Sequence, residues 1–431
     1  MAFRLDEPPV AGHGYGPGMV CLFLRLVLVA GVSLRAASRV LGTISEALGL
    51  SLAVPCWTTG RLWLLRLGHA MLTAPRERGD DWAWLVDHSV QIGKDKCLVI
   101  LGVRLRDLPE PGESPRHEDL KLIELKPAKS WTRAQVDGAL EQAALRTGIT
   151  PRLIVSDHGS DLIGGIGLFQ CRHPGTAEIY DAKHKAACLL KHLLENNPRW
   201  KEFQTCVAQA RCALQQTELA FLIPSAAKPK ARFMNLRPQL NWAKHVLAVL
   251  RDPQKVAPFA TAERLAEKVG WIQAFEADVI EWRQWQQVVD VTVTQVNCQG
   301  IFRGGAGKLD ERLSQLDALG TSARHLADEL VGFVRTQELQ TRPGERFPGS
   351  TEILESSFGK FKQLEKQQSR GGFTQLLLGF GAMLTKVTTD VVREAMRTSR
   401  TLDIRRWAAE TLGVTLTAQR KIAFACATED G

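Results

Sequence analysis

The sequence lacks any pair of cysteines spaced as Cys-x-x-Cys, although it contains nine cysteines between Cys21 and Cys426. An odd number of scattered cysteines excludes a disulfide framework and favours a reducing compartment such as the cytoplasm. One grouping offers zinc-ligand types at a spacing that matches no familiar zinc finger: Cys171, His173, His184 and Cys188.

Long apolar runs are also missing. The longest candidate, Met19 to Leu34, is interrupted by Arg25 and followed by Arg35 and Arg39. It falls short of the ~20 residues that a membrane span needs. We therefore predict a buried helix in this region and no membrane partner. The chain shows no internal repeat and no long low-complexity tract.

Two common catalytic motifs are absent. The segment Gly304–Leu309 lacks the leading glycine of a phosphate loop and the hydroxyl residue that should follow Lys308, so ATP use is not indicated. The segment Asp157–Asp161 contains Asp, His and Ser, but such close neighbours do not form a catalytic triad, and no nucleophile elbow is present. Ester or peptide hydrolysis is not expected.

The bulk composition predicts several folded units and a polyanionic partner. The 431 residues are 45% hydrophobic, which is enough for more than one core. Lysine and arginine total 55 against 46 acidic residues, which gives a net charge of +9. This balance favours, without requiring, a partner such as DNA.

Residues 1–80 are expected to form a helical DNA-binding domain. After a Gly/Pro-rich leader, residues 19–73 show helical periodicity. The stretch Gly31–Leu41 resembles a helix-turn-helix, with small residues for a close crossing, and a second helix would open near Thr58. Its arginines would contact DNA: Arg35, Arg39 and Arg61. The alternative is an ordinary helical hairpin with solvated arginines.

Residues 81–200 change to an alternation of strands and helices. Three strands come first, with a tight turn at Gly93-Lys94-Asp95 between the first two: residues 82–87, 97–105 and 120–125. A helix over residues 132–147 follows, and then a strand over residues 152–156 that ends at Asp157. A helical turn through Gly165, a strand over residues 177–180 and a long helix over residues 181–195 come next. This order predicts an α/β fold with a ribonuclease H-like core and a mixed five-stranded sheet.

Residues 201–345 are expected to be a helical insertion. They lack strand alternation except in the β-branched run Val288–Val296. A Pro/Gly-rich break at 342–349 closes the insertion, and a new helix should begin at Ser350 or Thr351 and reach Lys366. Residues 346–431 would then complete the catalytic core and add a basic helical tail.

Asp87 and Asp157 each end a predicted strand, and these two strands would be neighbours in a sheet of this order. Their carboxylates would therefore meet at one edge of the sheet. Cutting a phosphodiester develops charge on the entering and leaving oxygens, which two Mg²⁺ ions held by carboxylates can stabilise.

With these strand ends the sequence resembles the DDE-type transposases of bacterial insertion sequences, in which a glutamate on a later helix supplies the third acid. The helix predicted after Ser350 matches that position best with Glu355, while Glu352 lies about one turn away. The resemblance implies Mg²⁺ or Mn²⁺ held by the two aspartates and Glu355, and DNA phosphates contacted by Lys360 and Lys362.

A further resemblance, to Mutator-like and hAT-like transposases, concerns an Asp-x-x-His element after the second acid. Tyr180-Asp181-Ala182-Lys183-His184 occupies that place. The resemblance implies that His184 orients a phosphate or relays a proton. The alternative is that Asp181 caps a helix beside a half-buried histidine.

Two tryptophans in the insertion, Trp282 and Trp285, lie at helical spacing. In related transposases aromatic residues of the insertion stack on unpaired or flipped bases. Core packing is the commoner fate of two tryptophans so spaced, and we prefer it.

Together these features predict a DNA transposase that cleaves insertion-sequence ends and transfers the strands. Its partners would be double-stranded DNA of the element ends and target, with a homodimer or larger assembly in the DNA complex. It would act in the bacterial cytoplasm, at the nucleoid. The alternative is a domesticated descendant that binds DNA as a regulator and no longer cuts it.

Overall fold

The computed structural model divides the chain into two compact units, the first formed by residues 1–179 with 351–431 and the second by residues 180–350. The residues that it describes are 4–5, 7–92, 95–225, 233, 236–316, 319–367, 374–413, 419, 420, 422 and 424. Each unit is described by itself below. No helix in this part of the chain is both long and apolar enough to cross a lipid bilayer.

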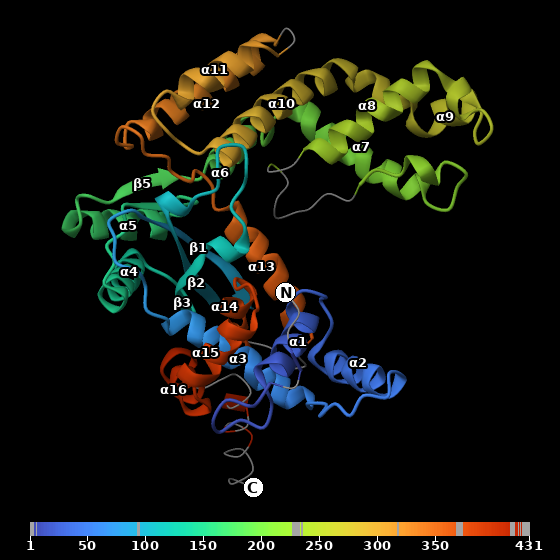
Figure 1. Cartoon of the computed structure of the whole chain (residues 1–431). Helices are drawn as coiled ribbons and strands as arrows, with labels where there is room; N and C mark the ends of the chain where they lie inside the picture. Colours follow the sequence, from blue (N-terminus) through green and yellow to red (C-terminus); the bar gives the residue numbers. More distant parts are fainter. Residues whose placement is uncertain are drawn as a thin grey trace. The chain divides into compact units, whose positions relative to one another are not determined.

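The first unit is built on a five-stranded mixed sheet with strand order β3-β2-β1-β4-β5 (Figure 1). Its strands are β1 (Trp82–Ile92), β2 (Asp95–Arg104), β3 (Lys121–Ala128), β4 (Leu153–Ser156) and β5 (Ala177–Tyr180). β1, β2 and β3 form an antiparallel meander, and β4 joins β1 in parallel. The α/β class and the strand positions predicted from the sequence are therefore confirmed. Gly93 and Lys94 of the predicted turn lie outside the described residues.

One face of the sheet is covered by α4 (Arg133–Thr147) and α5 (Ser160–Arg172). Trp84 and Val86 of β1 share a buried cluster there with Leu140 of α4 and Phe169 of α5. A capping box starts α4, since Thr132 accepts from the amide of Gln135 while the Gln135 side chain accepts from Thr132. Where the sequence indicated a single helical turn through Gly165, α5 is a helix of 13 residues.

The opposite face packs on helices from the C-terminal part of the chain. Ile123 of β3 points into the α4–α5 cluster, whereas its neighbour Leu122 lies against Gly381 of α14 (Gly379–Met383). On the same side α13 (Glu352–Glu365) contacts β1. Because side chains alternate along a strand, residues of β1 next to Trp84 and Val86 face α13.

The N-terminal helices are α1 (Pro17–Leu28), α2 (Leu34–Ala47) and α3 (Trp57–Thr73), and they pack with α15 (Thr389–Thr398) and α16 (Thr401–Leu412). Ser33 caps α2, and α1 is largely buried, as the sequence predicted. Helix α3 crosses so close to α14 that a side chain at Gly68 would overlap the carbonyl oxygen of Leu378. A helix enclosed in this way is a core element of the first unit.

The second unit is helical. It comprises α6 (Ala182–Leu194), α7 (Pro198–Leu214), α8 (Arg237–Arg251), α9 (Ala262–Val269), α10 (Glu276–Gln299), α11 (Gly305–Ser314) and α12 (Thr321–Glu338). The β-branched run Val288–Val296, set apart in the sequence as strand-like, lies within α10. Helix α6, which the sequence assigned to the 81–200 segment, belongs to this unit rather than to the first.

Candidate functional site at the ends of β1 and β4

Asp87 and Asp157 occupy matching positions on neighbouring parallel strands. The register pairs Ala83 with Leu153 and Leu85 with Val155, and the same offset places Asp87 opposite Asp157, which directly follows β4. The residues that alternate with the two aspartates along their strands belong to the α4–α5 cluster on one face of the sheet. The aspartates therefore belong to the opposite face, on which α13 packs. Two carboxylates are thus brought to one corner of the sheet.

The backbone changes course immediately after Asp87. The β1–β2 register shifts between Asp87 and Val90, where β1 gains one residue relative to β2. A β-bulge of this kind re-aims the following side chains and is common beside active sites. Asp87 itself is 7% exposed, and one of its carboxylate oxygens accepts a 2.6 Å hydrogen bond from the His88 amide.

The loop after Asp157 is also constrained. The Gly159 amide donates to Asp157 Oδ1 at 2.9 Å, which orients the carboxylate. His158 adopts φ 61°, in the left-handed region that non-glycine residues rarely use. Such strain is held in place by surrounding contacts and is concentrated at functional sites.

A histidine follows each aspartate, and each histidine pairs with a further acid. His88 Nδ1 lies 3.3 Å from Asp161 Oδ2, at the start of α5, and His158 Nε2 lies 3.2 Å from Glu178 Oε1 on β5. Neither histidine was predicted from the sequence to belong to the site. The repeated Asp-His at both strand ends was the signal that could have found them.

His88 is buried inside this corner. Its ring stacks on Trp131 with centroids 5.3 Å apart, and its Nε2 has no hydrogen-bond partner among the described residues. Burial lowers the pKa of His88, and the carboxylates of Asp161 and Asp157 partly oppose this effect. The imidazole is therefore a neutral group near pH 7, placed within electrostatic reach of Asp157.

Helix α13 carries both candidates for the third acid. It begins after Thr351, as predicted, so Glu352 is its first residue and Glu355 its fourth, and both are half-buried. Leu354 and Phe358 are buried and anchor the helix, which contacts β1. The helix that carries Glu352 and Glu355 therefore packs against the strand that carries Asp87.

The donor set at this corner suits a hard divalent cation, because it consists of carboxylate oxygens. Within the described ranges, however, no three His, Cys, Asp or Glu side chains already converge closely enough to hold a metal ion. The strands and the helix supply the acids, and binding of an ion would require their side chains to draw together. The possible zinc ligands named from the sequence, Cys171, His173, His184 and Cys188, do not form such a group either.

His184 lies in the second unit, whereas the acids lie in the first. Asp181 is 1% exposed and caps α6 by accepting from the His184 amide at 2.9 Å, and the imidazole Nδ1 lies 3.4 Å from the same carboxylate. These contacts match the alternative given from the sequence, in which Asp181 caps the helix beside a half-buried histidine. A catalytic role for His184 stays a prediction.

The structure corrects the assignment of Trp282 and Trp285 to DNA. They are 0% and 3% exposed, and Trp282 packs edge-on against Trp200 with centroids 4.8 Å apart. Trp285 Nε1 donates to Ser322 Oγ at 3.1 Å. Both rings belong to the core of the second unit, as the preferred interpretation expected, and neither is placed to stack on a base.

The N-terminal arginines are placed unequally. Arg39 is exposed on α2, and the Arg35 guanidinium lies 5.0 Å from the centre of the Trp57 ring. Arg61 lies on α3, half-buried, and the buried side of that helix forms the core of the unit. Helix α3 therefore does not offer the free face of a recognition helix, and α2 is the exposed basic element.

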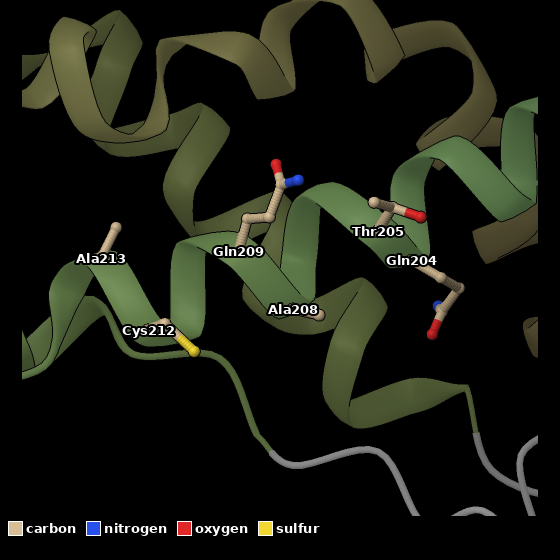
Figure 2. A pocket seen from close by; sticks show the side chains of 6 residues that line it. All are labelled: Gln204, Thr205, Ala208, Gln209, Cys212 and Ala213. Atoms are coloured by element: carbon tan, nitrogen blue, oxygen red, sulfur yellow. The ribbon is translucent and has the colours of Figure 1, made fainter.

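A hollow of about 860 Å³ lies along α7 in the second unit (Figure 2). Six side chains of that helix line it: Gln204, Thr205, Ala208, Gln209, Cys212 and Ala213. It contains no carboxylate and no histidine. Among the described lining residues, Cys212 is the one whose side chain is of a type used in metal or nucleophilic chemistry, and it has no second such group beside it in the lining.

Among the described cysteines, Cys56 is the one whose thiol has a clearly lowered pKa. It precedes α3, and the hydroxyls of Thr58 and Thr59 lie 3.0 and 3.2 Å from its sulfur. These hydrogen bonds lower the pKa of Cys56 to about 7. Burial instead raises the pKa of Cys21 and Cys97.

We predict that iodoacetamide modifies Cys56 before Cys21 and Cys97, because the thiolate is the nucleophile. Its rate should be half-maximal near pH 7, since the thiolate fraction rises as pH passes the pKa. In Thr58→Val the midpoint should move upward. Peptide mass mapping across a pH series measures both, and an unchanged midpoint would rule out the hydroxyl contacts as the cause.

No protein-family model and no curated protein matches this sequence.

Proposed function

We propose that the protein is a DNA transposase that cleaves phosphodiester bonds at insertion-sequence ends and transfers the strands, with divalent metal at the corner formed by β1, β4 and α13. The observation that carries the proposal is the matched register of Asp87 and Asp157 on neighbouring parallel strands, facing the helix that bears Glu355. The strand order β3-β2-β1-β4-β5, with β2 antiparallel, supports a ribonuclease H-like core. The helical second unit falls between the second acid and the third, as an insertion would.

In this proposal Asp87, Asp157 and Glu355 hold Mg²⁺ or Mn²⁺. When bound, these ions would stabilise charge on the attacking and leaving oxygens. The chain contributes the orientation of the carboxylates: the His88 amide fixes one oxygen of Asp87, and the Gly159 amide fixes one of Asp157. Each of these hydrogen bonds engages Oδ1 of its carboxylate.

The partner in this proposal is double-stranded DNA, both element end and target. Its phosphates would be contacted by the exposed Lys360 and Lys362 on α13 and by Arg39 on α2. A homodimer or larger assembly would bring two ends together. The salt dependence of binding would report the number of phosphate contacts.

The test compares two glutamates on the same helix. Glu355→Gln should abolish Mg²⁺-dependent cleavage of DNA carrying the element's own ends, because the third oxygen ligand would lose its charge. Glu352→Gln should retain cleavage and cost on the order of 1 kcal/mol or less of stability. The cost arises because a negative charge at the first helical position interacts favourably with the free backbone amides and with the helix dipole.

Nicking and joining of end-labelled DNA measure activity, and urea unfolding measures stability. Reversed activities would assign the third ligand to Glu352. Wild-type protein that binds the ends and never cleaves them, in Mg²⁺ or in Mn²⁺, would instead identify a DNA-binding regulator.

A further inference from the structure

A cavity of about 510 Å³ lies in the first unit, between α1, the short helix η2 (His117–Asp119), α13 and the segment that follows α14. Part of its lining is apolar, including Leu28, Leu364 and Leu384. Its charged and titratable lining residues come from all four elements: Arg25, Arg116, His117, Glu118, Lys360 and Lys386. Four permanent cations thus share one concave surface with a single acid.

Three of these cations have no acidic partner among the residues that the structure describes. Arg116, Lys360 and Lys386 are exposed, and none forms an ion pair with a carboxylate in the part of the chain that the structure describes. Elsewhere in the first unit, exposed arginines such as Arg106 and Arg172 are paired with acids. Concave walls that carry one sign of charge concentrate the field and attract counter-ions.

His117 contacts Lys360 and leaves its other ring nitrogen without a partner among the described residues. Lys360 Nζ lies 3.2 Å from His117 Nδ1, and because an ammonium only donates, Nδ1 must accept and the ring proton must reside on Nε2. Burial and the charge of Lys360 lower the pKa of His117, consistent with this neutral form. Nε2 is buried and has no partner among the described residues, so its N–H lacks an acceptor.

We propose that this cavity binds a backbone phosphate of DNA, with Arg116, Lys360 and Lys386 neutralising its charge and His117 positioning Lys360. The choice of DNA as the source of the phosphate rests on the function proposed above. Lys360 follows Glu355 by five residues on α13, a rise of about 7.5 Å along the helix axis. One helix therefore joins the acid corner to the cavity, and a strand held in the cavity would lead toward the acids.

The experiment uses the full chain and a fluorescent duplex of the element end, without divalent metal, so that binding is measured apart from cleavage. The variant is Arg116→Gln with Lys386→Gln, which removes two charges at exposed positions. The matched control is Arg397→Gln with Arg405→Gln, which removes two exposed charges from α15 and α16. Thermal melts of all three proteins establish that they are folded.

We expect the cavity variant to bind roughly tenfold or more weakly, and its plot of log affinity against log salt to be shallower by about 1, since the loss of one phosphate contact removes about 0.9 from the slope. The control should retain the wild-type slope. Equal slopes for the cavity variant and the control would overturn the proposal.

A second arm separates DNA from a free phosphate. If inorganic phosphate stabilises the wild type and not the cavity variant, while DNA binding is equal in both, the cavity takes a small phosphate and its assignment to DNA is wrong. If the wild type binds DNA with the expected difference in slope but never cleaves it, the cavity assignment stands and the transposase proposal fails.

Discussion

Asp87→Asn is expected to reduce metal-dependent DNA cleavage by at least about a thousandfold, because metal stabilisation of phosphoryl-transfer charge is worth several kcal/mol. The substitution keeps the shape of the side chain and an Oδ1 that can still accept from the His88 amide. It removes only the charge. Asp157→Asn should have a similar effect for the same reason, since its Oδ1 can still accept from Gly159.

Three measurements make this prediction specific. Cleavage is followed with end-labelled DNA, Mn²⁺ binding by calorimetry, and DNA affinity without metal, which should change little. The control is Asp390→Asn, an acid on α15 whose side chain is 83% exposed and pairs with Arg393. Full cleavage by Asp87→Asn or Asp157→Asn would remove the metal site from this corner of the sheet.

Trp282→Ala is expected to destabilise the second unit by about 3–5 kcal/mol, the usual cost of deleting a buried aromatic ring. The ring is 0% exposed and contacts Trp200 and Phe203 with centroid separations of 4.8 and 5.1 Å. Its removal would leave a cavity bordered by α7 and α10. Urea unfolding of the full chain should show an earlier transition for this unit.

The matched control is Ile280→Ala, on the same helix but 53% exposed, which should cost about 0.5 kcal/mol or less. Because the chain has two units, each transition is to be analysed separately. A stable Trp282→Ala protein with impaired DNA binding would contradict the core placement and favour base stacking.

Local signals in the sequence predicted most of the sheet. The strand Ala177–Tyr180 was predicted at both its ends, and the helix predicted over residues 132–147 is α4, Arg133–Thr147. Such patterns are carried by neighbouring residues, so they can be read without the fold. The run Val288–Val296 was misleading because β-branching is a weak preference that burial within α10 overrides.

The candidate site was only partly predictable. The predicted strand order was enough to place Asp87 and Asp157 near each other, since neighbouring parallel strands end at the same edge of a sheet. The pairing of His88 with Asp161 depends on the bulge after Asp87, a shift of one residue that the sequence does not reveal. The enclosure of α3 likewise arises from contacts with helices more than 300 residues later in the chain, such as the approach of Leu378 to Gly68.

The discontinuity of the first unit bears on how the protein is made. The strands that carry Asp87 and Asp157 are translated before the second unit, and α13 is translated after it. At an elongation rate of about 5–20 residues per second, translation of the two aspartates precedes that of Glu355 by on the order of ten seconds or more. During that interval the nascent chain has its sheet but not its third carboxylate, so a product released early by a frameshift or stop codon in the second unit would retain α2 and lack Glu355. Under the proposed function, such a fragment would compete for DNA without cutting it.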